Sequence, residues 1–506
     1  MEYRYKLKPH IELKRVKGGV VAISPNPLLA LRLNETAARL LETCQEWSSA
    51  TQVAMAIGSN QKQVERTLAE LAARRLLLQQ PLLSLEVNEN WPSVSVVVPV
   101  RNRPIDIERC MQSLRALDYP PDKLEIIVVD DASTDNTAEV VRQLPIDQAI
   151  CMNEWGGAAA CRNVGASVAK GEIIAYTDSD CEVTPGWLRE LIPYFGEAKN
   201  GIVGGRVDSF SLDTAIERYE SVASSLYMGL EERECRPNSA IPFLPTANLL
   251  IRRKIWQQLG GFDPAFPIGE DVDLVWRTCE AGYKVQYVPR GAVLHKYRCR
   301  LNSFVKRKAF YGGSETFLLR KHPTQRKLFY IPRQRVPFVA LLLLGLLWPI
   351  ALLVAPLVPL AETILRYRQL QRFGGHLGFW VVLTATARNY ASMFLHLCGN
   401  IARYYGFLIL LVGLFWWPLL VVGLFCFGYA ALYDYFTRHP KLALPIFVGL
   451  YWLELMAHQV GMLGRCVECR TLRPMIPALK IECRKSEIGN RKTSLPTTDH
   501  RPPTTL

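Results

Sequence analysis

The 506-residue sequence lacks two patterns that would assign it to common protein classes. Its opening residues, MEYRYKLKPHIELKRV, are too polar for a secretory signal peptide, so we expect the N-terminal half to stay in the cytoplasm. Its thirteen cysteines show no repeated zinc-ligand spacing, since Cys466 and Cys469 form one close pair and no second pair completes four ligands. The sequence therefore does not predict a zinc module, and cytosolic thiols of this kind are expected to be reduced.

Acidic residues are scarce in two stretches that border the apolar C-terminal region. Lys296 to Arg335 contains twelve Lys or Arg and one acid, Glu315, and the chain from Gly461 onwards contains nine Lys or Arg and four acids. Basic residues beside apolar segments fit the positive-inside rule and attraction to anionic lipid. Because the sequence also lacks a nucleic-acid-binding signature, its formal charge of +14 predicts membrane lipids as partners and no nucleic acid.

Residues 1–86 have the pattern of a small domain. Two strand-like segments, at residues 11–16 and 19–23, precede three helical segments. Asn34 is the expected N-cap of the first helix, and Ser59 is the expected N-cap of the third. Two strands followed by three helices predict a winged-helix-like module.

Residues 93–330 change to an α/β pattern. Three short apolar runs, of the kind expected for strands covered on both faces, alternate with helical segments. The strand-like runs are Ser93–Val100, Leu124–Val129 and Glu172–Thr177, and the helical segments are Ile105–Leu117, Thr134–Leu144 and Ala158–Ala169. This alternation predicts a mostly parallel sheet with right-handed crossovers, in which ligands bind beyond the carboxyl ends of the strands.

Residues 336–464 have the composition of membrane helices. Four segments are candidates: Val336–Ala361, Leu377–Leu397, Phe407–Leu432 and Ala443–Met462. Prolines interrupt the first, and the second contains Arg388, which favours an interfacial or bundled helix. We expect two to four spans, a multi-pass protein of the cell membrane, and a cytoplasmic catalytic domain. Residues 465–506 form a basic tail that is typical of disorder.

Pairs of acids follow two of the predicted strands. Asp130 and Asp131 follow EIIVV, where carboxylates can accept hydrogen bonds from a nucleoside or can cap the next turn. Asp178 and Asp180 follow EIIAYT, and two carboxylates one residue apart can share Mg²⁺ or Mn²⁺ that bridges to a diphosphate. Asp273 completes a second D-x-D with Asp271, but it lies in a predicted helix and is not interpreted as the metal site.

Several other polar residues are weaker candidates. Asp271 opens a predicted helix, where its carboxylate can take a proton from an attacking hydroxyl or can simply favour the helix dipole. Arg101, Arg162 and Arg206 stand near predicted strand ends or in loops, where they can face a pyrophosphate. His295 follows a short apolar segment and can contact phosphate or metal. A single histidine more often makes ordinary hydrogen bonds within the protein and binds no ligand.

Together these motifs resemble glycosyltransferase family 2, which has a GT-A fold. The matching elements are VSVVVPVRNR (94–103), EIIVVDDASTDNT (125–137), ACRNVGASVAKGEIIAYTDSDCEVTPGWL (160–188), TANLLIRRKIWQQLGGFDPAF (246–266) and GEDVDLVWRTCEAGYKVQYVP (269–289). The resemblance implies a metal-dependent transferase that moves a sugar in one step with inversion. It also implies site residues of three kinds: donor contacts by Pro99, Arg101, Asp130, Asp131, Arg162 and Asp178; metal contacts by Asp180, Asp178 and His295; and acceptor contacts by Glu270, Asn248 and Gly205 around the base Asp271.

One departure and one further resemblance bear on the substrate. Processive synthases of this family carry Q-x-x-R-W before their membrane helices, and here that region reads KRKAFYGGSETF (306–317), which argues against long-polymer synthesis. Residues 1–80 resemble a PqqD-like peptide-binding domain. The domain order resembles the mycofactocin system glycosyltransferases, which implies transfer of glucose from UDP-glucose to a peptide-derived redox cofactor or its precursor. The alternative is a lipid or exopolysaccharide acceptor.

Overall fold

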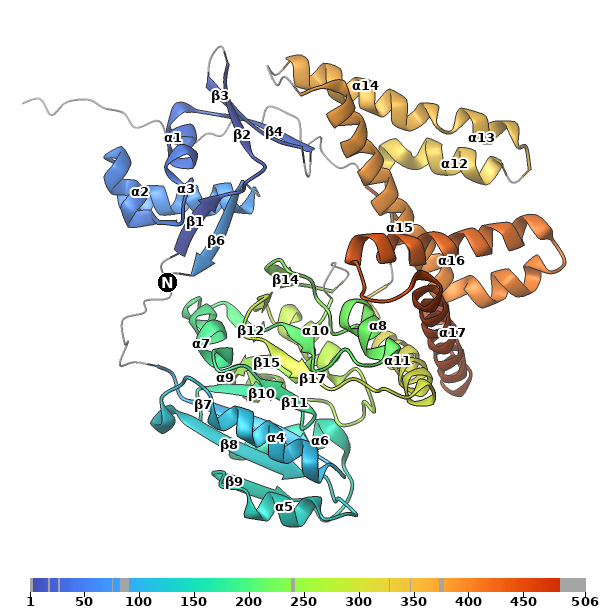
Figure 1. Cartoon of the computed structure of the whole chain (residues 1–506). Helices are drawn as coiled ribbons and strands as arrows, with labels where there is room; N and C mark the ends of the chain where they lie inside the picture. The colour runs from blue at the N-terminus through green and yellow to red at the C-terminus, as the bar shows by residue number, and fades with distance from the viewer. Residues whose placement is uncertain are drawn as a thin grey trace, which may run out of the picture. The chain divides into compact units, whose positions relative to one another are not determined.

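The computed structural model describes residues 3–16, 19–25, 28–74, 76–81, 91–237, 242–326, 328–345, 347–372 and 377–482. The chain divides into two compact units (Figure 1). Among the described residues, one unit comprises those within 1–83, 330–394 and 479–482, and the other comprises those within 84–329 and 395–478.

The first unit contains the N-terminal module. Its elements are β1 Tyr3–Leu7, β2 Glu12–Val16, β3 Gly19–Pro25, β4 Leu28–Leu33, α1 Glu35–Thr43, β5 Ser48–Ser49, α2 Ala50–Ile57, α3 Gln61–Ala73 and β6 Leu77–Pro81. Strands β2, β3 and β4 form one antiparallel sheet, and β5, β1 and β6 form another. As predicted, the Asn34 side chain caps α1 by accepting from Ala37 N at 2.8 Å. The prediction for α3 is wrong by one residue, because Asn60 and not Ser59 caps it.

The same unit continues with apolar helices, α12 Val336–Leu344, α13 Ile350–Val354 and α14 Leu357–Arg372, and with the first part of α15 Phe379–Gly413. Val21, Ile23 and Ala30 of the N-terminal sheet are buried together with Leu370 of α14 and Val382 of α15. Apolar contact therefore joins the N-terminal module to these helices.

The second unit is built on an eight-stranded sheet among the described residues. Its strand order is β14-β16-β12-β15-β10-β7-β8-β9. These strands are β7 Val94–Val100, β8 Leu124–Asp130, β9 Gln148–Cys151, β10 Ile173–Tyr176, β12 Asn200–Gly204, β14 Arg233–Cys235, β15 Leu249–Arg252 and β16 Lys284–Tyr287. Strands β10, β7, β8 and β9 run parallel, whereas β15 is antiparallel to β10 and to β12. The mostly parallel sheet confirms the predicted GT-A-like fold class.

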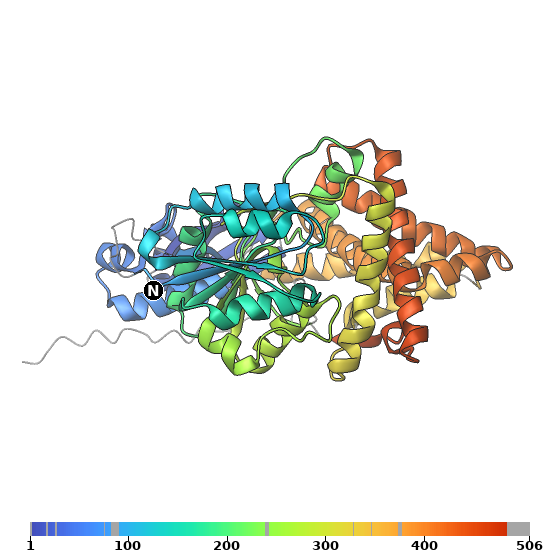
Figure 2. The same cartoon turned by 90° about the horizontal axis from the view of Figure 1, so that it is seen from below.

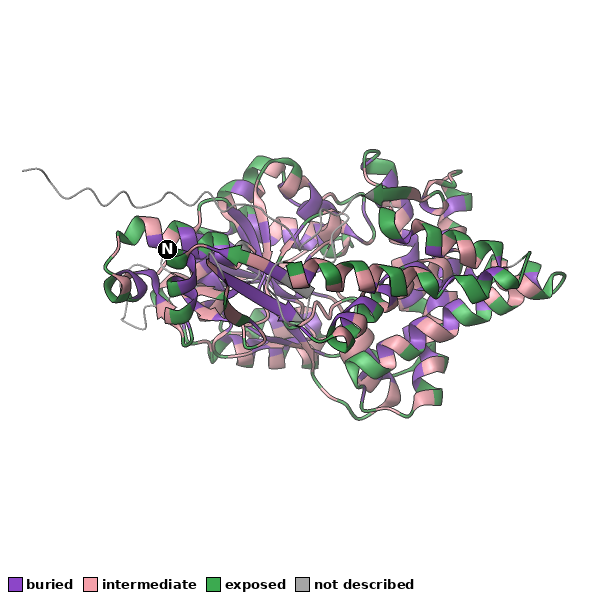
Figure 3. Ribbon diagram, turned by 90° about the horizontal axis from the view of Figure 1, so that it is seen from above, coloured by how far each residue is buried: buried purple, intermediate pink, exposed green. Residues whose placement is uncertain are grey.

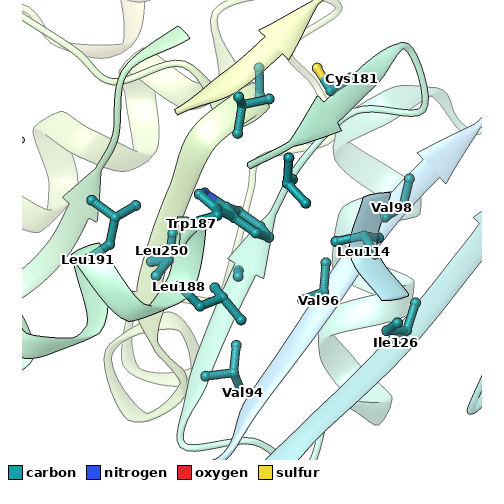
Figure 4. Packing of buried hydrophobic residues seen from close by; sticks show 14 of the residues in the cluster. Val94, Val96, Val98, Leu114, Ile126, Cys181, Trp187, Leu188, Leu191 and Leu250 are labelled. Carbon is teal, nitrogen blue, oxygen red and sulfur yellow. The ribbon is translucent and has the colours of Figure 1, made fainter. Parts of the chain in front are cut away.

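Helices cover both faces of this sheet (Figure 2). They are α4 Pro104–Arg115, α5 Thr137–Gln143, α6 Gly157–Val168, α7 Trp187–Leu191, α9 Arg253–Leu259 and α10 Glu270–Glu280. Two further helices, α8 Ala215–Ala223 and α11 Leu301–Lys321, pack against each other. Alternate residues of β7 enter different cores, because successive side chains of a strand point to opposite faces. Val96 packs with Leu114 and Trp187 on one face, and Val97 packs with residues of α6 and α10 on the other. Figure 4 shows the first of these clusters around Trp187. The central strands β7 and β10 are buried at every residue except the half-buried Pro99 (Figure 3), as the continuous apolar runs predicted.

A smaller sheet lies beside the carboxyl end of β10. It contains β11 Cys181–Val183, β17 Val293–His295 and β13 Val207–Ser209. In the antiparallel pair of β11 and β17, Cys181 stands opposite His295. This register brings a residue from late in the domain next to the Asp178–Asp180 motif.

Two long C-terminal helices complete the second unit, α16 Trp417–Arg438 and α17 Leu444–Glu468. Helix α17 lies alongside α11 (Figure 2), and their approach is close at two glycines. A Cβ on Gly312 would stand 2.0 Å from the carbonyl oxygen of His458, and a Cβ on Gly461 would stand 1.7 Å from that of Ala309. Only glycine fits where two helix backbones approach this closely.

Four helical segments of the described chain are long and apolar enough to cross a membrane: Ile350–Arg372, Phe379–Gly413, Trp417–Arg438 and Leu444–Glu468. This number is the upper end of the predicted two to four. The predicted span Phe407–Leu432 is wrong, because the chain turns at Leu414–Trp416 and begins a new helix with Pro418 near its start. Neither charge nor hydropathy marks that turn, since both flanks are apolar.

Candidate active site

The metal-site candidates meet at the carboxyl end of β10. Asp178 and Asp180 follow this strand directly, and the pairing of β11 with β17 places His295 beside them. The Nε2 atom of His295 lies 3.7 Å from a carboxylate oxygen of Asp180. Together with Cys181, these side chains present ligand atoms within 4.8 Å of one another. The structure thus brings together the three residues that the sequence predicted as metal ligands.

The chemistry of this cluster fits a hard divalent cation. Burial and the charges of Asp180 and Asp178 raise the pKa of the Cys181 thiol well above its ordinary value. The remaining carboxylates and imidazole are donors that suit Mg²⁺ or Mn²⁺. The Nδ1 atom of His295 is buried without a hydrogen-bond partner among the described residues. Asp178, Asp180 and His295 are therefore the residues that could hold the ion.

A buried arginine joins the two sides of the site. Arg162 lies on α6 with only 4% of its surface exposed. One terminal nitrogen donates to Asp178 at 2.7 Å and the other donates to Glu270 at 2.8 Å. Burial alone would lower the pKa of Arg162, but Asp178 and Glu270 raise it overall, so the guanidinium stays charged. Arg162 therefore ties the end of β10 to the first turn of α10 through two charge-assisted hydrogen bonds.

Asp271 is the second residue of α10 and lines a cavity of about 760 Å³. Arg162, Asp178 and His295 line the same cavity, so segments far apart in the sequence converge there. Burial and the neighbouring Glu270 raise the pKa of Asp271 to about 7. A carboxylate with a pKa near neutrality is suited to accept a proton from a hydroxyl.

Asp130 and Asp131 have local hydrogen-bonding roles at the end of β8. Asp130 accepts hydrogen bonds from the hydroxyl and the backbone N–H of Ser133, which is the capping role considered from the sequence. Asp131 accepts from the backbone N–H groups of Gly156 at 2.7 Å and Gly157 at 3.0 Å. Both carboxylates therefore fix the loops that form this end of the sheet.

The other donor-side candidates lie nearby or elsewhere. Pro99 lies in β7 opposite Val129 of β8, and Arg101 follows the same strand. One terminal nitrogen of Arg101 lies 3.9 Å from Asp131, and the guanidinium packs 5.6 Å from the centre of the Trp155 ring. Arg206 is instead paired with Asp208 at 2.9 Å and does not line the cavity.

Two predicted acceptor contacts are buried in the fold and do not line the cavity. Asn248 has no exposed surface. Its side chain accepts from Trp187 at 2.8 Å and donates to the carbonyls of Arg206 and Gly291. Gly205 is packed so tightly that a Cβ would stand 2.5 Å from the Asn248 side chain. These residues shape the loops behind the site, whereas Glu270, the third predicted contact, does line the cavity.

Asp273, the second acid of the other D-x-D, has a structural role and is not among the residues of the metal-site cluster. Asp273 is fully buried and pairs with Arg277, Lys321 and His322. Although burial raises its pKa, hydrogen bonds from His322 and Lys321 and the charge of Arg277 hold the pKa at about 2. Asp273 therefore anchors α10 to the end of α11.

Two arginines of the site were not predicted from the sequence. Arg103 pairs with Asp180 at 2.9 Å and stands two residues after Arg101 in the same segment, which could have marked it. Arg307 lines the cavity from α11. It belongs to a basic run that was assigned to the membrane flank, so no local signal separated it from its neighbours.

Comparisons with known proteins show which proteins this chain is similar to. Residues 95–260 match the model of the family described as glycosyl transferase family 2. The pre-mycofactocin glycosyltransferase of Mycobacterium tuberculosis is 36% identical over 234 residues, which cover 46% of this chain and 48% of that protein. Glycosyltransferase AglE of Haloferax volcanii is 31% identical over 202 residues, which cover 39% of this chain and 64% of that protein. The chain thus matches about half the length of the first relative.

Solved structures with weaker likeness include two transferases. The mannosyltransferase PcManGT from Pyrobaculum calidifontis, in complex with GDP-Man and Mn²⁺, is 19% identical with a TM-score of 0.36, and the match covers 70% of this chain and 97% of that one. GalNAc-T7 with UDP, GalNAc and Mn²⁺ is 18% identical with a TM-score of 0.34, and the match covers 47% and 52%. The match to residues 95–260, the mostly parallel sheet and the acidic cleft thus make this domain similar to the family 2 glycosyltransferases.

Proposed function

We propose that the protein transfers a sugar from a nucleotide-sugar donor to a hydroxyl group of an acceptor, with inversion at the anomeric carbon. The observation that carries this proposal is the convergence of Asp178 and Asp271 in one cavity, with Arg162 hydrogen-bonded both to Asp178 and to Glu270 beside the base. A transferase of this kind needs a metal-binding carboxylate and a proton acceptor on opposite sides of the reacting carbon.

The chain's own residues have separate roles in this reaction. Asp178, Asp180 and His295 would hold Mg²⁺ or Mn²⁺, which when bound offsets the charge of the departing diphosphate. Pro99, Arg101, Asp130 and Asp131 form the proposed nucleoside side of the donor site. Asp271 takes the proton of the acceptor hydroxyl as that oxygen attacks the sugar, and its raised pKa supports this role.

The proposed acceptor is a peptide-derived redox cofactor of the mycofactocin type, or its precursor, and the proposed donor is UDP-glucose. Two features support this choice: the 36% identity to pre-mycofactocin glycosyltransferase, and an N-terminal module whose pattern resembles peptide-binding PqqD-like domains. A module that holds the acceptor would raise its effective concentration at the cavity. The four apolar helical segments support a location in the cell membrane, with the catalytic domain on the cytoplasmic side.

The test is to incubate the full-length protein in detergent with Mn²⁺, a panel of UDP- and GDP-sugars, and a mycofactocin-type acceptor. We expect a mass increase of one hexose per transfer with UDP-glucose, and none with the Asp271→Asn variant. A membrane lipid extract serves as the competing acceptor. Transfer to lipid alone would support the second candidate, a transferase acting on a lipid or exopolysaccharide, which the apolar helices favour equally. An absence of transfer to either acceptor from every donor would contradict the proposal.

A further inference from the structure

The apolar segment that follows Arg335 folds back on itself. Residues 336–361 include no charged side chain, and they contain α12, α13 and the start of α14. Helix α12 lies against both of the other helices (Figure 1), and a Cβ on Gly345 would clash with the side chain of Leu352. The chain therefore turns tightly at residues 345–349 and returns alongside α12.

The first arm of this hairpin is too short to cross a membrane. Helix α12 has 9 residues, which at about 1.5 Å each extend about 14 Å, whereas the hydrocarbon core of a bilayer is about 30 Å thick. The first charged residue after the turn is Glu362 of α14. Its carboxylate lies 3.7 Å from Arg335 and accepts a hydrogen bond from Tyr390 of α15 at 2.8 Å. The two ends of the apolar segment therefore meet in one polar cluster.

The turn of the hairpin is apolar and exposed, whereas its base is basic. Leu347, Trp348 and Ile350 are 69%, 65% and 75% exposed. The basic residues at the other end of the hairpin are Arg333, Arg335, Arg366, Arg368 and Arg372. A surface that is apolar at its tip and basic at its base matches one leaflet of a bilayer, in which acyl chains lie beneath anionic headgroups.

The backbone of the turn suits a medium without water. The N–H groups of Gly345, Leu347 and Trp348 donate to carbonyl groups of α12 at 2.9, 3.0 and 2.8 Å. Pro349, the next residue, has no N–H group that needs a partner. Because an unpaired backbone group is costly in hydrocarbon, a turn whose N–H groups donate within the chain can lie among acyl chains.

Contacts at the end of α14 indicate the side of the membrane to which the hairpin returns. Leu370 of α14 and Val382 of α15 are buried together with Val21 and Ile23 of the N-terminal module. The end of the hairpin therefore lies on the same side of the membrane as this module.

The start of the hairpin lies on that side as well. Residues 82–92 connect the N-terminal module to the catalytic domain, and they are too few and too polar to cross a bilayer, since they include Glu86 and Glu89. All four candidate spans of the described chain begin at Ile350 or later. The chain from the N-terminal module to Arg335 thus stays on one side, and so do both ends of the hairpin.

We propose that residues 336–372 form a re-entrant hairpin, which enters the membrane from the side of the catalytic domain, turns at about half of the bilayer depth and returns to the same side. The apolar segment Ile350–Arg372 then anchors the protein without crossing the membrane. This inference goes beyond the proposed function and does not depend on the donor or the acceptor. It also places the N-terminal module at the membrane surface, because the sheet of this module packs against the returning end of the hairpin.

The experiment determines the side of the membrane on which the hairpin ends. A factor Xa site is inserted after Gly374 of the full-length protein, and a control protein carries the same site after Asn88, in the connection between the N-terminal module and the catalytic domain. Sealed inverted vesicles and sealed right-side-out vesicles from the expressing cells are treated with the protease. Cleavage is measured from the masses of the fragments.

We expect both sites to be cut in one vesicle preparation and protected in the other. Cleavage after Gly374 only where the Asn88 site is protected would overturn the inference, because the segment would then cross the membrane. Trypsin treatment of the wild type is a second measurement that needs no insertion. It should cut after the exposed Arg372 in the preparation in which the Asn88 site is cut, and cleavage there only in the other preparation would also overturn the inference.

Photo-crosslinking identifies what covers the turn of the hairpin. Benzoylphenylalanine in place of Leu347 should form adducts with lipid when the membranes are irradiated, as measured by mass spectrometry. In place of Ile105, an equally exposed apolar residue of α4, it should form none. Adducts of the Leu347 position with a second copy of this chain or with another protein, and none with lipid, would overturn the inference. Because neither measurement involves sugar transfer, the proposed function would stand if this inference failed.

Discussion

The ionisation of Asp271 should set the pH dependence of sugar transfer. Only the carboxylate can accept the hydroxyl proton, so the rate should follow the ionised fraction of this residue. Burial and the charge of Glu270 raise its pKa to about 7, against 3.8 for an ordinary aspartate. The ionised fraction is therefore about nine tenths at pH 8, one tenth at pH 6 and one hundredth at pH 5.

The predicted profile of kcat/KM has a plateau above pH 8 and falls with unit slope below pH 7. At pH 5 the value should be about a hundredfold below the plateau. An aspartate with an ordinary pKa would lose less than about a tenth of its activity over the same range. The quantity to measure is kcat/KM at low acceptor concentration, because it reports the pKa values of the enzyme before the acceptor binds.

Variants assign the inflection to Asp271, because histidines titrate in the same range. Asp271→Asn should lower kcat/KM about 10²- to 10⁴-fold and remove the inflection. Glu270→Gln should move the inflection to lower pH, because the charge that raises the pKa is gone. His295→Gln should lower the plateau and leave the inflection in place. An inflection near pH 4, or an Asp271→Asn variant with the wild-type profile, would refute the assignment of the base.

Three further results are expected. Chelation of divalent cations with EDTA, or the change Asp180→Asn, should abolish transfer in the mass-detected assay. Added Mn²⁺ should restore the activity of the chelated wild type but not that of the variant. Activity that survives both treatments would contradict the metal site. Lys308→Met should lower the free energy of unfolding by about 3–5 kcal/mol, because Glu220 and Glu454 lose the cation that they share. Chemical denaturation in detergent measures this loss, and the change Lys306→Met at an exposed residue should have little effect. Gly461→Ala should lower the thermal midpoint of unfolding, because the new Cβ would clash with the Ala309 carbonyl. Gly464 lies in the same helix, and a Cβ there would have no neighbour within 4 Å, so Gly464→Ala should raise the midpoint slightly. Equal shifts of the two midpoints would contradict the close helix crossing.

The strands and helices of the catalytic domain could be predicted from the sequence because both faces of the sheet are covered. Continuous apolar runs such as that of β7 are typical of strands buried on two sides, and Val96 and Val97 do enter different cores. The position of the acids proposed for the metal site could be predicted because parallel strands end at one edge of a sheet. That rule alone was enough to predict that Asp178 and Asp180 lie at this edge.

The rest depended on tertiary contacts that no local pattern encodes. The bridge from Arg162 to Asp178 and Glu270 joins residues up to 108 positions apart. The sequence predicted Asn248 as an acceptor contact, but its side chain makes three hydrogen bonds within the protein. The position of Arg307 in the cavity could not be predicted, because it belongs to a run of basic residues whose other members have different environments.

Helix boundaries in the apolar region were the least predictable part. The run Phe407–Leu432 has the length and composition of a span, yet the chain turns at Leu414–Trp416. Hydropathy is averaged over a window and does not detect a turn between two apolar helices. The close packing at Gly312 and Gly461 could not be predicted either, because a glycine in a sequence does not indicate which part of the chain packs against it.

The stereochemistry of the product tests the account of the cleft most directly. Transfer from an α-linked nucleotide sugar should give a β-linked product, measured from the coupling constant of the anomeric proton of the transferred sugar by NMR. This outcome is predicted because Asp271 deprotonates the acceptor for a single displacement opposite the leaving diphosphate. An α-linked product would show retention of configuration and would contradict the role given to Asp271.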